Sequence, residues 1–207
     1  MANDPNLDPK TLVVPGHGNV LISTDETAEP FDITGFNIKD TATYGPGWES
    51  LGYTSKENTV EFSKDGGDVS SVDTWEEDGM DTTYEATLWS VLIRALSMQR
   101  KTFEYAFGGG EWDDELKGYG MGDVEPITKS MMIIFAHNGK RAGAYIRRIK
   151  VGAGDAPSID PEQFFEIELK GDILASDSAK YKKIFWYSAR PYDASIPPVT
   201  VEAPDQV

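Results

Sequence analysis

The sequence predicts a mainly β protein, an antiparallel β-sandwich or barrel of about eight strands with one flanking α-helix and a long loop. Apolar and polar residues alternate over 84–88 and 165–170, which predicts strands with one solvated face. Asn138-Gly139 separates two apolar runs. This is a strong hairpin signal, because a type I′ turn needs positive φ at both central positions.

Composition divides the 207 residues into three parts. Residues 1–18 are polar and contain three prolines, so we expect an N-terminal arm. Residues 19–190 form the predicted β domain, and 191–207 an acidic, Pro-rich C-terminal tail. Inside the domain, residues 40–79 are rich in Gly, Ser, Asp and Thr. A loop of that length within a compact domain is normally functional or disordered.

The elements follow one another in a simple order. Short strands are expected at 20–22 and at 31–38, the second with a bulge at Gly35 where its phase slips. The strand at 83–88 runs into the one predicted helix, whose apolar residues recur at i, i+3, i+4 and i+7. Those helix residues are Trp89, Leu92, Ile93 and Leu96. The hairpin strands 131–137 and 140–151 come next, then strands at 165–170 and 184–187.

Charged residues are segregated along the chain. Between Glu57 and Glu85 there are ten acidic residues and one base, whereas residues 137–154 hold five bases and no acid. Sorting of this kind favours a partner with the opposite sorting, and a second copy of the chain is the nearest candidate. The net charge of −16 argues against nucleic-acid binding, which needs cations to neutralise phosphates.

Features that would signal catalysis or a bound metal are weak. Cysteine is absent, which excludes disulfides and thiolate metal sites, and the two histidines, His17 and His137, match no metal-binding spacing. The acids of 73–81 could gather Ca²⁺ but do not fit its known loop pattern, and a solvated acidic face is the simpler interpretation. We expect no enzyme, no cofactor and no metal. With no secretory signal and no apolar run long enough to span a bilayer, we also expect a soluble protein without membrane attachment.

Trp48 lies in a loop of small polar residues, Gly45 to Glu49. An apolar side chain in such a setting is typical of an anchor for a partner, so Trp48 is a candidate interface residue. A second interpretation stays open. Trp112 and Tyr119, with the acidic loop around them, could form the site of a carbohydrate- or receptor-binding β-sandwich module of a phage or a cell surface.

This arrangement resembles the major tail proteins, or tail tube proteins, of long-tailed siphophages, especially those infecting actinobacteria. The resemblance covers residues 19–190. It rests on the early strand before Phe31-Asp32-Ile33, the segment 47–55 (Gly-Trp-Glu-Ser-Leu-Gly-Tyr-Thr-Ser), the polar loop to Trp75, the strand 83–88 running into a helix, and the late strand pair. The length of the 108–128 loop and the acidic tail depart from the family pattern.

The resemblance implies a structural protein of the virion tail, assembled in the host cytoplasm. Six copies would form a ring whose inner strands join into one barrel, and stacked rings would form a hollow tube for genome ejection. The 40–79 loop would reach the neighbouring ring. Implied partners are further copies of the chain, a tape measure protein in the lumen, and tail terminator and tail tip proteins. DNA would pass without specific binding.

Two sets of residues follow as assembly candidates. The first is expected at subunit or ring interfaces: Trp48, Leu51, Tyr53, Lys140, Arg141, Arg147 and Arg148. The second is expected on an acidic face or in the lumen: Glu76, Glu77, Asp78, Asp81 and Glu85. Carboxylates on the wall of a bore repel DNA only within a screening length of about 8 Å, which prevents sticking without blocking transit. We therefore expect an electronegative bore.

Overall fold

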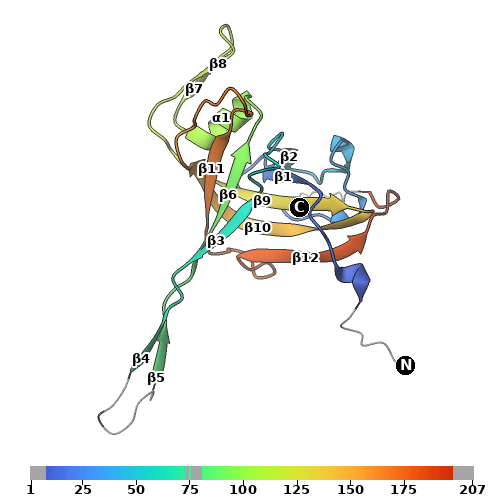
Figure 1. Cartoon of the computed structure of the whole chain (residues 1–207), viewed down its shortest axis with the longest axis vertical. Coiled ribbons are helices and arrows are strands. Elements are labelled where there is room, and N and C mark those ends of the chain that lie inside the picture. Colours follow the sequence, from blue (N-terminus) through green and yellow to red (C-terminus); the bar gives the residue numbers. More distant parts are fainter. Residues whose placement is uncertain (1–7, 73–74, 76–80, 198–207) are drawn as a thin grey trace, which may run out of the picture.

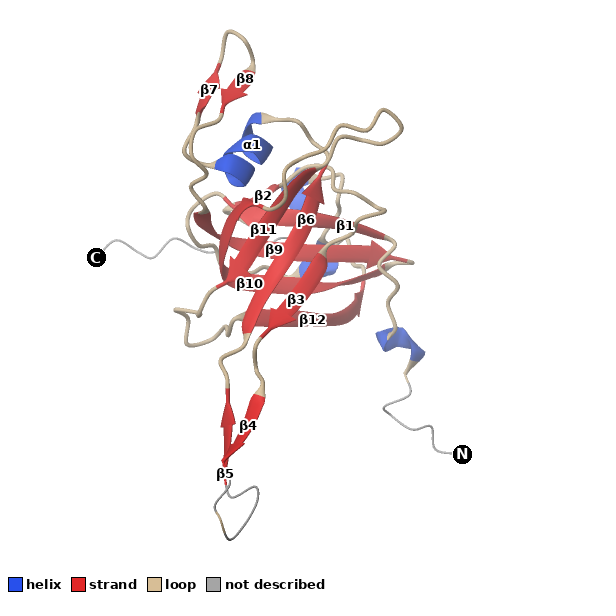
Figure 2. Ribbon diagram, turned by 60° about the vertical axis from the view of Figure 1, so that its left-hand side comes forward, coloured by secondary structure: helices blue, strands red, loops and turns tan. Residues whose placement is uncertain are grey.

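The structure is a computed structural model that describes residues 8–72, 75 and 81–197. Two long neighbouring strands lie at its centre (Figure 1). These strands, β9 (Ile127–His137) and β10 (Lys140–Ala153), pair in antiparallel fashion around Asn138-Gly139. Both turn residues have positive φ, 46° and 70°, which confirms the predicted hairpin. The mainly antiparallel β fold with one α-helix is confirmed as well (Figures 1 and 2).

The other elements are short. The remaining strands are β1 (His17–Ser23), β2 (Trp48–Ser50), β3 (Glu61–Asp65), β4 (Val69–Val72), β5 (Asp81–Tyr84), β6 (Leu88–Ala95), β7 (Glu111–Asp113), β8 (Gly118–Gly120), β11 (Ile167–Ile173) and β12 (Ile184–Pro191). The helices are α1 (Arg100–Phe107) and the 3-10 turns η1 (Pro9–Thr11), η2 (Ile33–Gly35) and η3 (Thr41–Thr43).

The main sheet runs β2-β1-β9-β10-β11-β6-β3, and β10 exchanges partners along its length. Its first part, from Lys140 to Ile146, pairs with β12, and its last part, from Ile149, pairs with β11. Between Ile146 and Ile149 its register with β9 shifts. An irregularity of this kind bends a strand and increases its twist. The sheet therefore folds into two layers, β2-β1-β9-β10-β12 and β9-β10-β11-β6-β3.

Alternating residues of the first layer belong to two different cores. Val20 and Ile22 of β1 face the main core between the layers, with Val91, Ile93 and the buried side of α1. Leu21, between them, faces a second core on the outer side of this layer. The segment 24–47 covers that second core with Phe31, Ile33 and Phe36. Side chains of successive strand residues point to opposite faces, so one strand contributes to both cores.

The predicted helix at 89–96 is wrong, because this segment is strand β6. Val91, Ile93 and Ala95 alternate into the main core, and β6 lies between β11 and β3. Leu88 and Leu92 lie on the other face of β6, and these additional apolar residues make the run fit helical spacing as well. The helix begins one turn later, at Arg100, and buries Thr102, Tyr105 and Ala106.

The strand predicted at 31–38 is also wrong. The chain forms the turn η2 there, and Asp32 caps it by accepting a hydrogen bond from the Thr34 N–H (2.8 Å). Gly35 is not a bulge. A Cβ atom at this position would lie 2.1 Å from the Ile196 carbonyl oxygen, so glycine permits close approach of the chain near its C-terminus.

The described part of residues 40–79 is not a structureless loop. It contains η3, β2, β3 and β4, and β4 pairs with β5 in a two-stranded ribbon that projects from the body (Figure 1). The strand predicted at 83–88 corresponds to the end of β5 and the start of β6, with three residues between them. The strands expected at 165–170 and 184–187 appear as β11 and β12.

Both ends of the described chain lie against the domain. Lys140 Nζ donates to the carbonyl oxygens of Pro9 (3.1 Å) and Leu12 (2.9 Å). Asp193 donates its N–H to the Thr34 carbonyl oxygen (3.1 Å). No helix of the described residues is long and apolar enough to cross a bilayer.

The centre of the β9–β10 pair gives a test of this packing. Replacing Gly143 by Ala would place Cβ 2.2 Å from the Ile133 carbonyl oxygen, a backbone atom that cannot turn aside. We expect Gly143→Ala to lower the free energy of unfolding by about 1–3 kcal/mol. Gly118→Ala is the matched control, because nothing lies within 4 Å of its Cβ position. Urea unfolding of both variants measures the difference, and equal stabilities would contradict the tight fit at Gly143.

Candidate assembly surfaces

The layer containing β3, β6 and β11 has a free edge at β3, because β6 is the one described strand that pairs with β3. The direction of the backbone groups follows from neighbouring hydrogen bonds. Ser55 donates its N–H to the Arg94 carbonyl oxygen, and Leu96 donates its N–H to the Tyr53 carbonyl oxygen, both at 2.8 Å. Even-numbered residues of β6 therefore turn their backbone groups toward the side on which β3 lies.

The register of the β3–β6 pair shows which residues of β3 direct their backbone groups toward β6. Its residues Glu61, Ser63 and Asp65 lie opposite the even-numbered residues of β6 and face that strand. Phe62 and Lys64 consequently direct their N–H and C=O groups to the open edge.

The other edge of this layer is the start of β9. The Ser130 N–H donates to Ser23 Oγ (2.8 Å), so Ser130 faces β1. Pairing with β1 begins only at Met131, and Thr128, two residues before Ser130, faces the same side beyond the end of β1. No described strand pairs with Thr128 on that side. The layer is therefore open at both edges.

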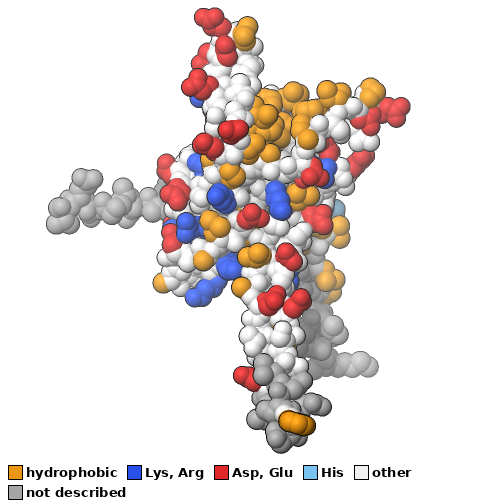
Figure 3. Space-filling model, turned by 90° about the vertical axis from the view of Figure 1, so that its left-hand side faces the viewer, with side chains coloured by type: hydrophobic (Ala, Val, Ile, Leu, Met, Phe, Trp, Pro, Cys, Tyr) orange, Lys and Arg blue, Asp and Glu red, His pale blue; other side chains and the backbone are white. Residues whose placement is uncertain are grey.

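One face of this layer is apolar and lies against the core, while the other is polar and carries both signs of charge. The polar-face charges, read from the pairing, are Glu61, Asp65, Arg94, Lys150, Glu168, Lys170 and Asp172. Two opposite-charge pairs sit directly across from each other, Lys150 with Asp172 and Arg94 with Glu168. Cross-strand pairs of this kind favour one register. Figure 3 shows acidic and basic side chains mixed on this side of the molecule.

The residues expected on an acidic or lumen face lie elsewhere. Asp81 and Glu85 are exposed on the projecting ribbon and its connection to β6. Glu85 is not in a strand; its N–H donates to the Asp68 carbonyl oxygen (3.0 Å). Glu76, Glu77 and Asp78 lie outside the described residues.

The expectation that Trp48 is an exposed anchor is wrong. Its side chain is 6% exposed, and its ring packs edge-on against Tyr145 with centroids 6.1 Å apart. The indole N–H donates to the Glu29 carbonyl oxygen (2.8 Å). Gly47, with φ of 76°, turns the chain back along β1, so the loop composition reflects a tight return and not an exposed tip.

The two neighbouring candidates differ from each other. Leu51 is fully buried in the main core and donates its N–H to the Val20 carbonyl oxygen (2.9 Å). Tyr53 is 82% exposed. Of the three apolar interface candidates, the surface available to a partner is therefore that of Tyr53.

Three of the four basic candidates make contacts inside the chain. Besides Lys140, which holds the N-terminal arm, Arg141 donates to the Phe36 carbonyl oxygen (2.7 Å) and lies over the Tyr192 ring. Burial lowers the pKa of Arg141. Arg147 forms ion pairs with Glu29 (2.8 Å) and Asp177 (3.0 Å), and its hydrogen bond lowers the pKa of the Asp177 carboxyl. Arg148 makes no ion pair within the described residues.

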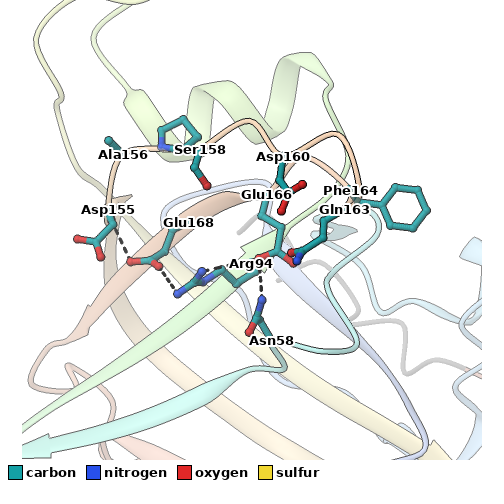
Figure 4. A pocket seen from close by; sticks show the side chains of 11 residues that line it. Asn58, Arg94, Asp155, Ala156, Ser158, Asp160, Gln163, Phe164, Glu166 and Glu168 are labelled. Carbon is teal, nitrogen blue, oxygen red and sulfur yellow. Dashed lines mark hydrogen bonds and ion pairs between the residues drawn. The ribbon is translucent and has the colours of Figure 1, made fainter.

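A charged network missed by the sequence analysis holds the loop 154–166 to the polar face. Arg94 bridges Glu168 (2.6 Å) and Glu166 (3.7 Å), as Figure 4 shows. Asn58 donates to Glu166 (2.9 Å), and the Asp155 N–H donates to Glu168 (2.9 Å). These groups line a cavity of about 280 Å³. The available signal was that Ser90 and Arg94 share one side of a strand whose other side is apolar, which the helical interpretation of 89–96 concealed.

The alternative sugar-binding surface loses one of its two rings. Tyr119 stacks near-parallel on Phe103 of α1, with centroids 6.1 Å apart. Its hydroxyl donates to the Gly108 carbonyl oxygen (2.8 Å) and accepts from the Gly110 N–H (3.1 Å). Tyr119 therefore fixes the β7–β8 hairpin to α1. Of the two rings proposed to bind a sugar, Trp112 is the one without such a structural role. Among the described residues, no group of His, Asp and Glu is arranged to hold a metal ion.

The fold defines a class of protein, a mainly antiparallel β subunit with unpaired sheet edges at β3 and at the start of β9. Comparison of the sequence with family profiles agrees: the profile described as phage tail tube protein matches residues 5–197. The match spans nearly the whole chain, so the chain belongs to the phage tail tube protein family. It is a structural protein of the virion tail. No curated protein matches the sequence.

Burial of Trp48 changes what its removal should do. We expect Trp48→Ala to lower the free energy of unfolding by about 3–5 kcal/mol, because it leaves a cavity between Phe31 and Tyr145. Tyr53→Ala, which removes an exposed aromatic ring five residues later, should change it by less than about 0.5 kcal/mol. Thermal and urea unfolding of the two variants check this. A Trp48→Ala protein as stable as the parent would show that the ring is not part of the core.

Loss of Arg94 should also be costly. Glu168, whose side chain is 9% exposed, would then lack its ion-pair partner, and we expect a loss of about 1–3 kcal/mol. The control is Arg100→Ala, which breaks the exposed i,i+4 pair with Glu104 and should cost about 0.3–0.5 kcal/mol. Limited proteolysis reports on the loop: faster cleavage within 154–166 is expected for Arg94→Ala alone.

Proposed function

We propose that this chain forms rings that stack into the hollow tail tube of a long-tailed phage and that the tube conducts the genome into the host. The observation that carries the proposal is the layer with two open edges, at β3 and at the start of β9. An exposed sheet edge is a template for pairing with another chain. A head-to-tail ring pairs one edge of each copy with the opposite edge of the next, and closure leaves no edge free.

In such a ring the layers of successive copies would join into one continuous barrel. Lys64 and Phe62 would pair through their outward backbone groups with the region of Thr128 in the neighbouring copy. The family resemblance implies six copies. The apolar face of each layer is already covered by its own core, so the polar face is the one free to line the bore.

This polar face supports a bore that does not hold DNA. It carries four carboxylates against three cations, and two of the cations lie opposite a carboxylate on the next strand. Paired cations are less available to phosphates, which bind proteins through free Lys and Arg. The acids of the ribbon, including Asp81 and Glu85, add negative charge where the ribbon reaches past the body.

The β4–β5 ribbon fits the role of an arm between rings. Its cross-strand neighbours Val69 and Tyr84 are 57% and 70% exposed, although they lie directly opposite each other. A two-stranded ribbon without a covered face has marginal stability in water. Contact with the adjacent ring would bury this pair and stabilise the ribbon.

The remaining partners follow from this role. Further copies form the tube, a tape measure protein would fill its lumen during assembly, and tail terminator and tail tip proteins would close its ends. Assembly would take place in the host cytoplasm. DNA would pass through without specific binding.

Proline substitutions at the two edges test ring closure. Lys64→Pro and Thr128→Pro each remove an N–H that faces outward, so neither breaks a hydrogen bond inside the chain. We expect folded monomers by circular dichroism and no rings or tubes by electron microscopy. The controls Lys64→Ala and Thr128→Val keep the N–H and should assemble like the parent protein. Assembly of both proline variants at parental levels would refute this edge pairing. Absence of rings in the concentrated parent protein would refute the proposed function itself.

A further inference from the structure

Two groups of side chains with opposite charge lie at opposite ends of the layer that contains β3, β6 and β11. At the α1 end, loop 154–166 contains four carboxylates and no base: Asp155, Asp160, Glu162 and Glu166. At the end from which the ribbon projects, a group that we call the basic collar consists of Arg148, Lys182 and Lys183. No collar residue forms an ion pair within the described part of the chain.

Contacts within the chain place these groups at opposite ends of the same layer. Lys183 Nζ donates to the Thr87 carbonyl oxygen (3.4 Å), just before β6 begins. The backbone carbonyl oxygen of Arg148 accepts a hydrogen bond from the Leu174 N–H (3.0 Å), just after β11 ends. Loop 154–166 precedes β11 and lies beside α1, above the body in Figure 1, whereas the ribbon projects below it. In Figure 3, Lys and Arg side chains cross the middle of this side, and hydrophobic side chains gather toward the α1 end.

Each end also exposes apolar side chains among its charges. Within loop 154–166, Ile159 is 88% and Phe164 82% exposed, and they flank Asp160 and Glu162. Figure 4 shows the Phe164 ring pointing away from the Arg94 network that lines the cavity. Near the basic collar, Leu88 and Trp186 are exposed, and Trp186 packs against Phe62 with ring centroids 5.0 Å apart. Apolar anchors surrounded by charge are typical of protein interfaces.

We infer that loop 154–166 of one subunit docks on the basic collar of a second copy in the adjacent ring and thereby sets the direction of stacking. The inference rests on the proposed function. Charge complementarity favours a copy of this chain, because the acidic loop of one copy meets the basic collar of the next only in head-to-tail order. Stacking in the opposite sense would place loop against loop or collar against collar.

The Arg94 network restrains loop 154–166 before it contacts a second copy. It ties Glu166 and Glu168 to the sheet, so the loop is held at its base before a partner arrives. Holding a loop in its bound form reduces the entropy lost on association. Asp160 and Glu162 are left free of ion pairs with described residues, and they are the carboxylates that face a partner.

The interaction divides into two contributions. Exposed ion pairs are individually weak and screened by salt, so they fix orientation and encounter rate. Burial of Phe164 and Ile159 against the apolar side chains near the collar supplies the larger, salt-insensitive part. No acid of the described part of the ribbon forms an ion pair with a collar residue.

Charge reversal followed by charge exchange tests the contact. Glu162→Lys and Lys182→Glu alone should each raise the critical concentration for tube growth about tenfold, which corresponds to about 1.4 kcal/mol per subunit. Rings should still form, because neither residue lies at the open sheet edges. The double variant, with both charges exchanged, should return the critical concentration to within about threefold of the parent. Phe164→Ala should raise it at high and low salt alike.

Matched controls lie on segment 24–47, outside both the loop and the collar. Glu26→Lys and Lys39→Glu make the same charge changes at exposed positions and should leave tube growth unchanged. Light scattering measures growth, and electron microscopy counts single rings against tubes. Rings that stack normally in both single variants would overturn the docking inference and leave the proposed function standing. A double variant no better than the singles would also overturn it. A parent protein that forms no rings would overturn both.

Discussion

The structure depends on the exchange of partners along β10. Its first part pairs with β12 and its last part with β11, and the register shift between Ile146 and Ile149 separates the two. Without that bend, β12 and β11 would compete for the same edge of one flat sheet. With it, the chain folds into two layers around an apolar core, and the layer of β3, β6 and β11 is left unclosed at both sides.

A sheet with unpaired edges makes a monomer prone to aggregation, whereas in a subunit that assembles the same edges can pair with neighbouring copies. Unpaired N–H and C=O groups on β3 and at the start of β9 favour association with any free strand. Charged residues beside these edges restrict which strand can pair. The polar face has its charges set opposite one another across the strands, so it is compatible with a wet bore and with one strand register.

The charged residues of the chain serve three distinct purposes. Arg141 and Arg147 act inside the subunit, where they hold loops against β10. Arg94 and Glu168 join the polar face to loop 154–166. In the stacking that we infer, the basic collar and the loop residues Asp160 and Glu162 contact other copies. The net charge of a sequence segment could not distinguish these purposes. Neighbouring charged residues of one segment can point in different directions, one toward loops of the same subunit and the next toward solvent.

The sequence alone determined the properties that depend on near neighbours in the chain. Asn138-Gly139 specified its hairpin through the backbone, and the alternation around 165–170 specified a strand, so the mainly β class and its family could be predicted. Only the tertiary structure decided how apolar segments were used. The run 88–95 became a central strand because β3 and β11 supplied hydrogen bonds on both sides, although its spacing fits a helix equally well. Trp48 entered the core because Phe31 and Tyr145, distant in sequence, provided a surface to cover it.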